Sequence, residues 1–122
     1  MGNVDVILKD AMQIDGSIGV ALVDYETGMS LGQAGGGGLD LDVAAAGNSD
    51  VVKAKLRTMA ALGLDEKIED ILITLSSQYH LLRLITARNG QGLFLYMALD
   101  KGKANLAMAR RQLTNLEKDI QV

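Results

Sequence analysis

The sequence contains no cysteine, proline or tryptophan and only one histidine, His80. The lack of cysteine excludes disulfides, thiolate metal sites and a cysteine nucleophile. A single histidine excludes a metal site with two histidine ligands. The lack of proline excludes a stiff proline-rich linker. Several common catalytic and metal-binding arrangements are therefore impossible in this chain.

Excess positive charge and long apolar runs are missing too. The formal net charge is -3, which disfavours a nucleic-acid binder, because such proteins carry a basic surface. No apolar run approaches the ~20 residues of a membrane-spanning helix, and the N-terminus lacks the basic-then-apolar order of a signal peptide. A length of 122 residues suits one domain. We therefore expect a single domain over residues 1–122, located in the cytoplasm, without nucleic-acid binding or membrane insertion.

Three consecutive β-strands are the most informative prediction. They are expected at 71–76, 79–87 and 93–99, separated by Ser77-Gln78 and by the run 89–92, which holds two glycines. In strand 93–99, apolar residues occupy both faces. A sheet with one face in water shows alternating apolar and polar residues instead. Both faces of this sheet should therefore be covered.

The remaining segments supply the covers. The patterns predict a helix at 3–14 capped by Asn3, strands at 18–25 and 29–34, a long helix from Leu39 or Asp40 to Leu62 or Gly63, and a last helix from Gly102 or Lys103 to about Ile120. The first and last helices have narrow apolar stripes, and the middle helix has a wide one. The predicted fold is α/β, in the order α-β-β-α-β-β-β-α. It is a five-stranded antiparallel sheet with two helices on one face and the middle helix on the other.

A run of four glycines, Gly35 to Gly38, precedes the middle helix. A phosphate-binding P-loop requires a lysine followed by serine or threonine soon after its glycines. The next lysine is Lys53, and Ala54 follows it. The run is thus better explained as a flexible link between strand and helix.

The apolar arc of the middle helix is about twice the ~100° that an ordinary surface helix needs. Val52, Leu56 and Met59 are expected to pack against the sheet. The rest of the arc predicts a closed twofold interface with a second copy, at Asn48, Val51 and Lys55. The polar side of the helix, which is left for solvent or a partner, consists of Ser49, Asp50, Lys53 and Arg57.

No catalytic constellation stands out, so we expect a protein that is not an enzyme, without a cofactor or metal. Ser76 and Ser77 lack the GxSxG setting of a serine nucleophile. His80 lies in a predicted strand and is expected to be hydrogen-bonded at the edge of the core. Arg83, also in a strand, must find a partner if its face is covered. Four carboxylates predict either a solvated link or a weak cation site: Asp65, Glu66, Glu69 and Asp70. Arg110, Arg111 and Lys118 are expected to form a solvated face of the last helix.

Three stretches resemble the Roadblock family of dynein light-chain-like regulators. They lie within 14–32 (Asp-Gly-Ser-Ile-Gly-Val-Ala-Leu-Val-Asp, then Thr-Gly), 79–86 (Tyr-His-Leu-Leu-Arg-Leu-Ile-Thr) and 93–113 (Leu-Phe-Leu-Tyr, then Ala-Asn-Leu-Ala-Met-Ala-Arg-Arg). The chain is most similar to short stand-alone bacterial members, which work beside Ras-like small GTPases and membrane sensor kinases. The four-glycine run departs from the family pattern.

The resemblance implies a Roadblock/profilin-like fold and a homodimer in which two sheets join edge to edge and two middle helices pack together. It also implies a GTPase that docks near those helices. We therefore expect a non-catalytic signalling protein that binds a Ras-like small GTPase and modulates its nucleotide cycle. The alternatives are a small-molecule sensor and a scaffold without GTPase regulation. A cavity of several hundred Å³ lined by aromatic side chains would favour the sensor.

Overall fold

The computed structural model describes residues 2–86 and 91–121. In these residues the elements follow in the predicted order: α1 (Val4–Ala11), β1 (Ser17–Asp24), β2 (Met29–Gly35), α2 (Leu41–Ala61), β3 (Asp70–Thr74), β4 (Gln78–Leu84), β5 (Leu93–Asp100) and α3 (Leu106–Lys118). The strand expected at 79–87 therefore begins one residue earlier and ends at Leu84. Its last residue, Ala87, and two residues of the predicted turn at 89–92 lie outside the described residues.

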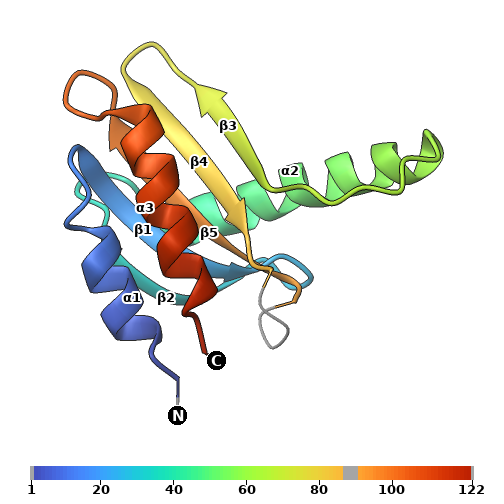
Figure 1. The fold of residues 1–122 in the computed structure, drawn as a ribbon, viewed down its shortest axis with the longest axis horizontal. Helices are drawn as coiled ribbons and strands as arrows, with labels where there is room; N and C mark the ends of the chain where they lie inside the picture. The colour runs from blue at the N-terminus through green and yellow to red at the C-terminus, as the bar shows by residue number, and fades with distance from the viewer. Residues whose placement is uncertain (1, 87–90, 122) are drawn as a thin grey trace.

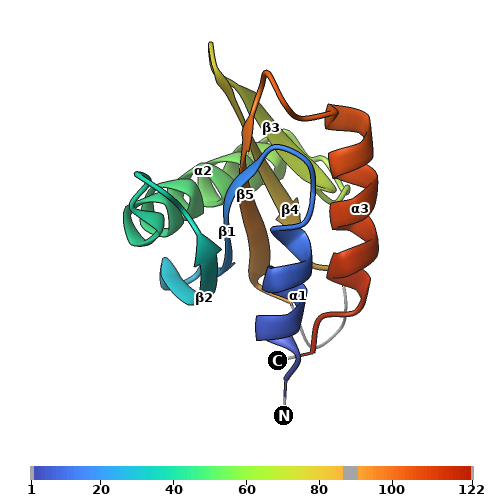
Figure 2. The same ribbon diagram turned by 90° about the vertical axis from the view of Figure 1, so that its left-hand side faces the viewer.

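The strands form one antiparallel sheet in the order β2-β1-β5-β4-β3. Strand β5 lies at the centre, and every residue from 93 to 99 is buried. Figure 2 shows why: α1 and α3 cover one face of the sheet, and α2 lies on the other. The predicted two-sided sheet and the predicted distribution of its helices are both confirmed.

Each face of the sheet has its own core. Beneath α1 and α3, the buried cluster includes Leu8, Leu22, Leu95 and Leu113. Beneath α2, the buried cluster includes Ala21, Val23, Ala45, Val52 and Phe94. The alternation of side chains along β1 and β5 sends neighbouring residues into opposite cores, which explains why nearly every residue of these strands is apolar.

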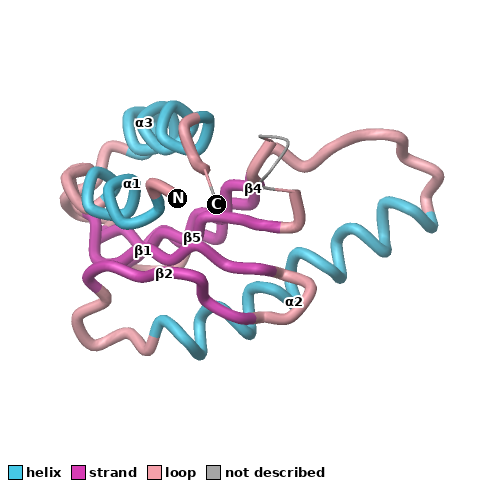
Figure 3. Tube along the Cα trace, turned by 90° about the horizontal axis from the view of Figure 1, so that it is seen from below, coloured by secondary structure: helices cyan, strands magenta, loops and turns pink. Residues whose placement is uncertain are grey.

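Helix α2 begins where the sequence indicates. The carboxylate of its N-cap, Asp40, accepts hydrogen bonds from the backbone N–H groups of Asp42 (3.0 Å) and Val43 (3.2 Å). Its second half extends beyond the sheet, and the chain then returns to the edge strand β3 (Figures 1 and 3). Among residues 2–86 and 91–121, this and the other helices are too short or too polar to cross a membrane.

The ends of α1 and α3 differ from the prediction. Asn3 makes no side-chain cap on α1; instead its Nδ2 donates to the carbonyl of Asp119 (2.6 Å), and its Oδ1 accepts from the backbone N–H of Gln121 (2.8 Å). Helix α1 ends at Ala11, before the predicted Ile14, which is nevertheless buried. Helix α3 starts later than expected because the side chain of Asn105 caps it, accepting from the N–H of Met108 (3.1 Å).

The glycine run links β2 to α2 and also forms a turn with a defined backbone conformation. Gly35, Gly36 and Gly37 have positive φ angles, which glycine adopts readily. Gly36 also lies against β1, since a Cβ added at Gly19 would come within 2.7 Å of the Cα and N of Gly36. The run links β2 to α2 as expected, and its first half also packs closely against β1.

Candidate functional site

One flank of α2 is left without a partner in the described chain. Val51 is 38% exposed and Lys55 is exposed. Asn48 is half-buried, and its Nδ2 donates to the carbonyl of Ala44 (2.8 Å). We call Asn48, Val51 and Lys55 the α2 flank. The sheet does not cover this flank because it contacts the adjacent side of the helix, where Val52 is buried and Leu56 is half-buried, as predicted.

An open sheet edge lies beyond α2. Among the described residues, strand β3 pairs only with β4 and forms one end of the sheet. Ile71 of β3 packs against the core on the α2 side, and Ile73, two residues on, points to the same side. Both side chains are only half-buried. The structure thus combines an unpaired strand with partly exposed apolar side chains.

The polar side of α2 is exposed at three of its four predicted positions. Asp50 and Arg57 are exposed, and Lys53 is partly exposed, with its Nζ 3.9 Å from Asp50 Oδ1. We call Asp50, Lys53 and Arg57 the polar stripe. The fourth assignment, Ser49, is wrong. Ser49 is 1% exposed because it lies one helical turn after Ala45 on the sheet-facing side, and its Oγ donates to the Ala45 carbonyl (2.7 Å).

His80 is hydrogen-bonded at the edge of the core, as predicted. Its Nε2 lies 2.7 Å from Gln78 Oε1, and its Nδ1 lies 3.3 Å from the hydroxyl of Tyr96. An amide oxygen only accepts, so Nε2 carries the proton and Nδ1 accepts from Tyr96. Burial lowers the pKa of His80 and raises the pKa of Tyr96. The arrangement favours a neutral structural histidine.

Arg83 has the partner that its strand position requires. Its guanidinium lies 3.3 Å from Oε1 of Glu117 on α3, and that carboxylate is fully buried. Glu117 also accepts hydrogen bonds from the backbone N–H of Thr86 (3.3 Å) and from its hydroxyl (3.0 Å). Glu117 was not predicted from the sequence. The sequence signal for its burial is its position one helical turn after the buried Leu113.

A second ion pair joins α3 to the edge strand. The guanidinium of Arg110 donates two hydrogen bonds, of 3.0 and 2.9 Å, to the carboxylate of Asp70. Asp70 is therefore paired and not simply solvated, and Arg110 is partly exposed while it makes this pair, whereas Arg111 and Lys118 are exposed as expected. Among the described residues, no group of three or more potential metal ligands comes together, so the structure gives no support to the cation site.

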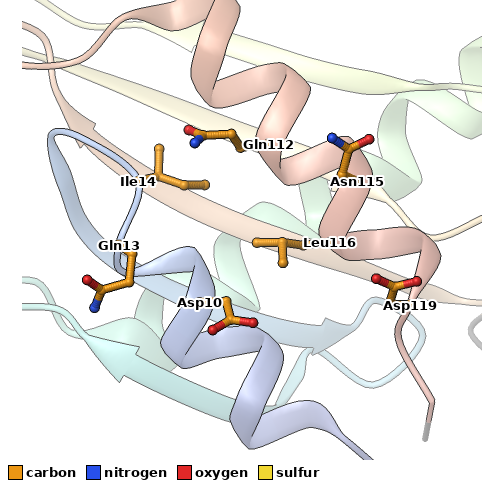
Figure 4. Close-up of a pocket in the computed structure, with 7 residues that line it drawn as sticks. All are labelled: Asp10, Gln13, Ile14, Gln112, Asn115, Leu116 and Asp119. Carbon is orange, nitrogen blue, oxygen red and sulfur yellow. The ribbon is translucent and has the colours of Figure 1, made fainter.

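A groove lies between α1 and α3, on the face of the sheet opposite α2 (Figure 4). Its main cavity has a volume of about 430 Å³. The lining residues are Asp10, Gln13, Ile14, Gln112, Asn115, Leu116 and Asp119. These residues include no aromatic side chain, so this cavity does not have the character that would favour a small-molecule sensor.

Comparison with known proteins identifies the fold. No protein-family model and no curated protein matches the sequence. Three solved structures are similar over 93% of this chain. They are a Roadblock/LC7 domain from Streptomyces avermitilis (17% identity, 91% of that chain, TM-score 0.78), MglB from Myxococcus xanthus (18%, 85%, 0.73) and an MglB with a tetrameric arrangement (14%, 82%, 0.78). The resemblance seen in the sequence is thereby confirmed at the level of structure: the chain has the Roadblock/LC7 fold.

Proposed function

We propose that this protein is a non-catalytic homodimer that binds a Ras-like small GTPase and modulates its nucleotide cycle in the cytoplasm. The observation that carries the proposal is the α2 flank, which exposes Val51; among the described residues, β3 also has no second strand partner. A second copy would cover both features at once, pairing β3 with β3 and α2 with α2. The family resemblance supports this assembly and a GTPase that docks near the paired helices. A membrane sensor kinase in the same system is part of the proposal.

The dimer is tested by light scattering on purified protein. Val51→Glu places a charge in the proposed interface, where an unpaired buried charge is strongly unfavourable, and we expect a monomer at tens of micromolar. Val43→Glu is the matched control, because Val43 lies on the same helix, is 68% exposed and is outside the α2 flank. It should remain dimeric. A monomeric wild type at this concentration would refute the dimer.

The partner is tested by a pull-down from the source cell. Immobilised wild-type protein is incubated with lysate containing GDP or a non-hydrolysable GTP analogue, and bound proteins are identified by mass spectrometry. We expect a Ras-like GTPase whose recovery depends on the nucleotide. Recovery of a GTPase equally with both nucleotides would favour the scaffold alternative. Recovery of no GTPase under either condition would overturn the proposed partner.

A further inference from the structure

The groove between α1 and α3 is continuous. The cavity of about 430 Å³ adjoins one of about 170 Å³, and Gln13, Ile14 and Gln112 line both. Together they follow α3 from Asn105 to Asp119. At 1.5 Å per helical residue this distance is about 21 Å, which matches about six residues of extended chain. We call this combined feature the α1–α3 groove.

The charged side chains among the described lining residues of the groove are all negative. Its polar residues are three aspartates and four amides: Asp10, Asp15, Asp119, Gln13, Asn105, Gln112 and Asn115. The described residues that line it include no lysine, arginine or histidine. The nearest cations along the chain, Lys9, Arg111 and Lys118, are exposed and outside the lining. The carboxylates are spread along the groove, with Asp10 and Asp119 toward one end (Figure 4) and Asp15 toward the other.

The fold positions the polar side chains of the groove but does not use them in its own hydrogen bonds. Asn3 fixes the position of Asp119 through the hydrogen bond to its backbone carbonyl (2.6 Å). Within residues 2–86 and 91–121, the side chains of Asp10, Gln13, Gln112 and Asn115 and the carboxylate of Asp119 have no hydrogen bond to protein. By contrast, the carboxylates of Asp70 on β3 and Glu117 on α3 are both paired with arginines. The groove therefore presents unengaged acceptors and donors.

We propose that the α1–α3 groove binds an extended peptide of about six residues that carries arginine or lysine, supplied by a partner protein. The carboxylates complement the basic side chains. The amides both donate and accept, so they suit the N–H and C=O groups of an extended backbone. Ile14, Leu116 and the exposed Met108 provide apolar contact. Helices α1 and α3, which bound this site, lie on the opposite face of the sheet from α2 (Figure 2), and the site does not depend on the proposed function.

The test uses the full chain, labelled with ¹⁵N, and a library of capped hexapeptides. In each sublibrary one position is fixed as arginine, glutamate or leucine, and the other positions are random. We expect arginine sublibraries to shift the backbone amide signals of 10–15 and 105–119, and glutamate sublibraries to shift them far less. No shift in these segments, or equal shifts with arginine and glutamate, would overturn the proposal.

A pair of variants separates binding from folding. Asp10→Asn with Asp119→Asn removes two groove carboxylates that make no hydrogen bond or ion pair with the described residues, and we expect about threefold to tenfold weaker binding of the arginine peptides. Asp5→Asn with Glu69→Gln is the matched control, since both residues are exposed and lie outside the groove. It should bind like wild type. Equal affinity of the two double variants would contradict the proposed role of the carboxylates.

Discussion

At the scale of single residues, Glu117 shows how the core of this protein holds a charge. The carboxylate is fully buried, and it receives the Arg83 guanidinium at 3.3 Å and two groups of Thr86. Taking a carboxylate out of water is unfavourable unless it is paired and hydrogen-bonded. The pair therefore fixes α3 against β4, because a shift of the helix would separate two buried charges.

Removing one member of this pair should be costly. We predict that Glu117→Ala lowers the free energy of unfolding by about 3–5 kcal/mol, because it leaves the Arg83 guanidinium buried without its partner. The double variant Arg83→Met with Glu117→Met should lose less than Glu117→Ala, because it removes both charges and keeps most of the volume. Urea unfolding followed by circular dichroism measures both. A loss below about 1 kcal/mol for Glu117→Ala would contradict this account.

Three residues show which contacts could not be predicted from the sequence. That Arg83 needs a partner follows from its strand position alone. The partner itself, 34 positions away, depends on how α3 lies across the sheet. Ser49 was misplaced because its polarity suggested exposure, although its spacing from Ala45 places it toward the sheet. Asn3 was expected to cap a helix, but its amide binds the other end of the chain instead.

At the scale of elements, the close contact between β1 and the glycine run sets the start of α2. A Cβ at Gly19 would lie 2.7 Å from backbone atoms of Gly36, which cannot move aside as the end of a side chain can. The side chain of Leu41, the first residue of α2, would lie 3.4 Å from a Cβ at Gly19 and 3.2 Å from a Cβ at Gly36. The glycine run therefore brings the helix close to the sheet.

We expect alanine substitutions at Gly19 and at Gly38 to differ in their effect on the free energy of unfolding. Gly19→Ala should lower the free energy of unfolding by about 1–3 kcal/mol, the usual effect of overpacking. Gly38→Ala should be neutral or slightly stabilising, because no atom of the described residues lies within 4 Å of a Cβ there and its φ is not positive. Thermal and urea unfolding of both variants checks the difference. Equal stabilities would mean that the turn adjusts without cost.

The helices and strands could be predicted because their apolar residues recur at regular spacings. The wide arc of α2 and the two apolar faces of β5 gave the three layers correctly. Element ends were less predictable, since they depend on local caps such as Asn105 and on contacts distant in sequence. The candidate groove was not predictable at all, because α1 and α3 lie at opposite ends of the sequence and meet only in the folded chain.

At the scale of the whole molecule, the sheet separates two candidate interaction surfaces. Helix α2, which carries the α2 flank and the polar stripe, lies on one side, and α1 and α3, which bound the α1–α3 groove, lie on the other (Figure 2). On α2, helical spacing places the polar stripe and the α2 flank on different sides of the helix. In the proposed dimer, the flank is used between copies, so each polar stripe stays accessible to a GTPase.

The last prediction concerns this polar stripe. Arg57 can pair with a carboxylate of the GTPase through two hydrogen bonds, so Arg57→Ala should weaken binding by about 2 kcal/mol or more, roughly thirtyfold. Lys53, which already lies near Asp50, should matter less, and Lys53→Ala should mainly reduce the salt dependence of binding.

Calorimetry with the GTPase recovered in the pull-down measures both. Arg111→Ala is the control, because it removes an exposed arginine from the opposite face. If Arg57→Ala and Lys53→Ala remain dimeric and bind within about twofold of wild type, a difference below about 0.5 kcal/mol, the stripe is only a solvated helix face and the GTPase docks elsewhere.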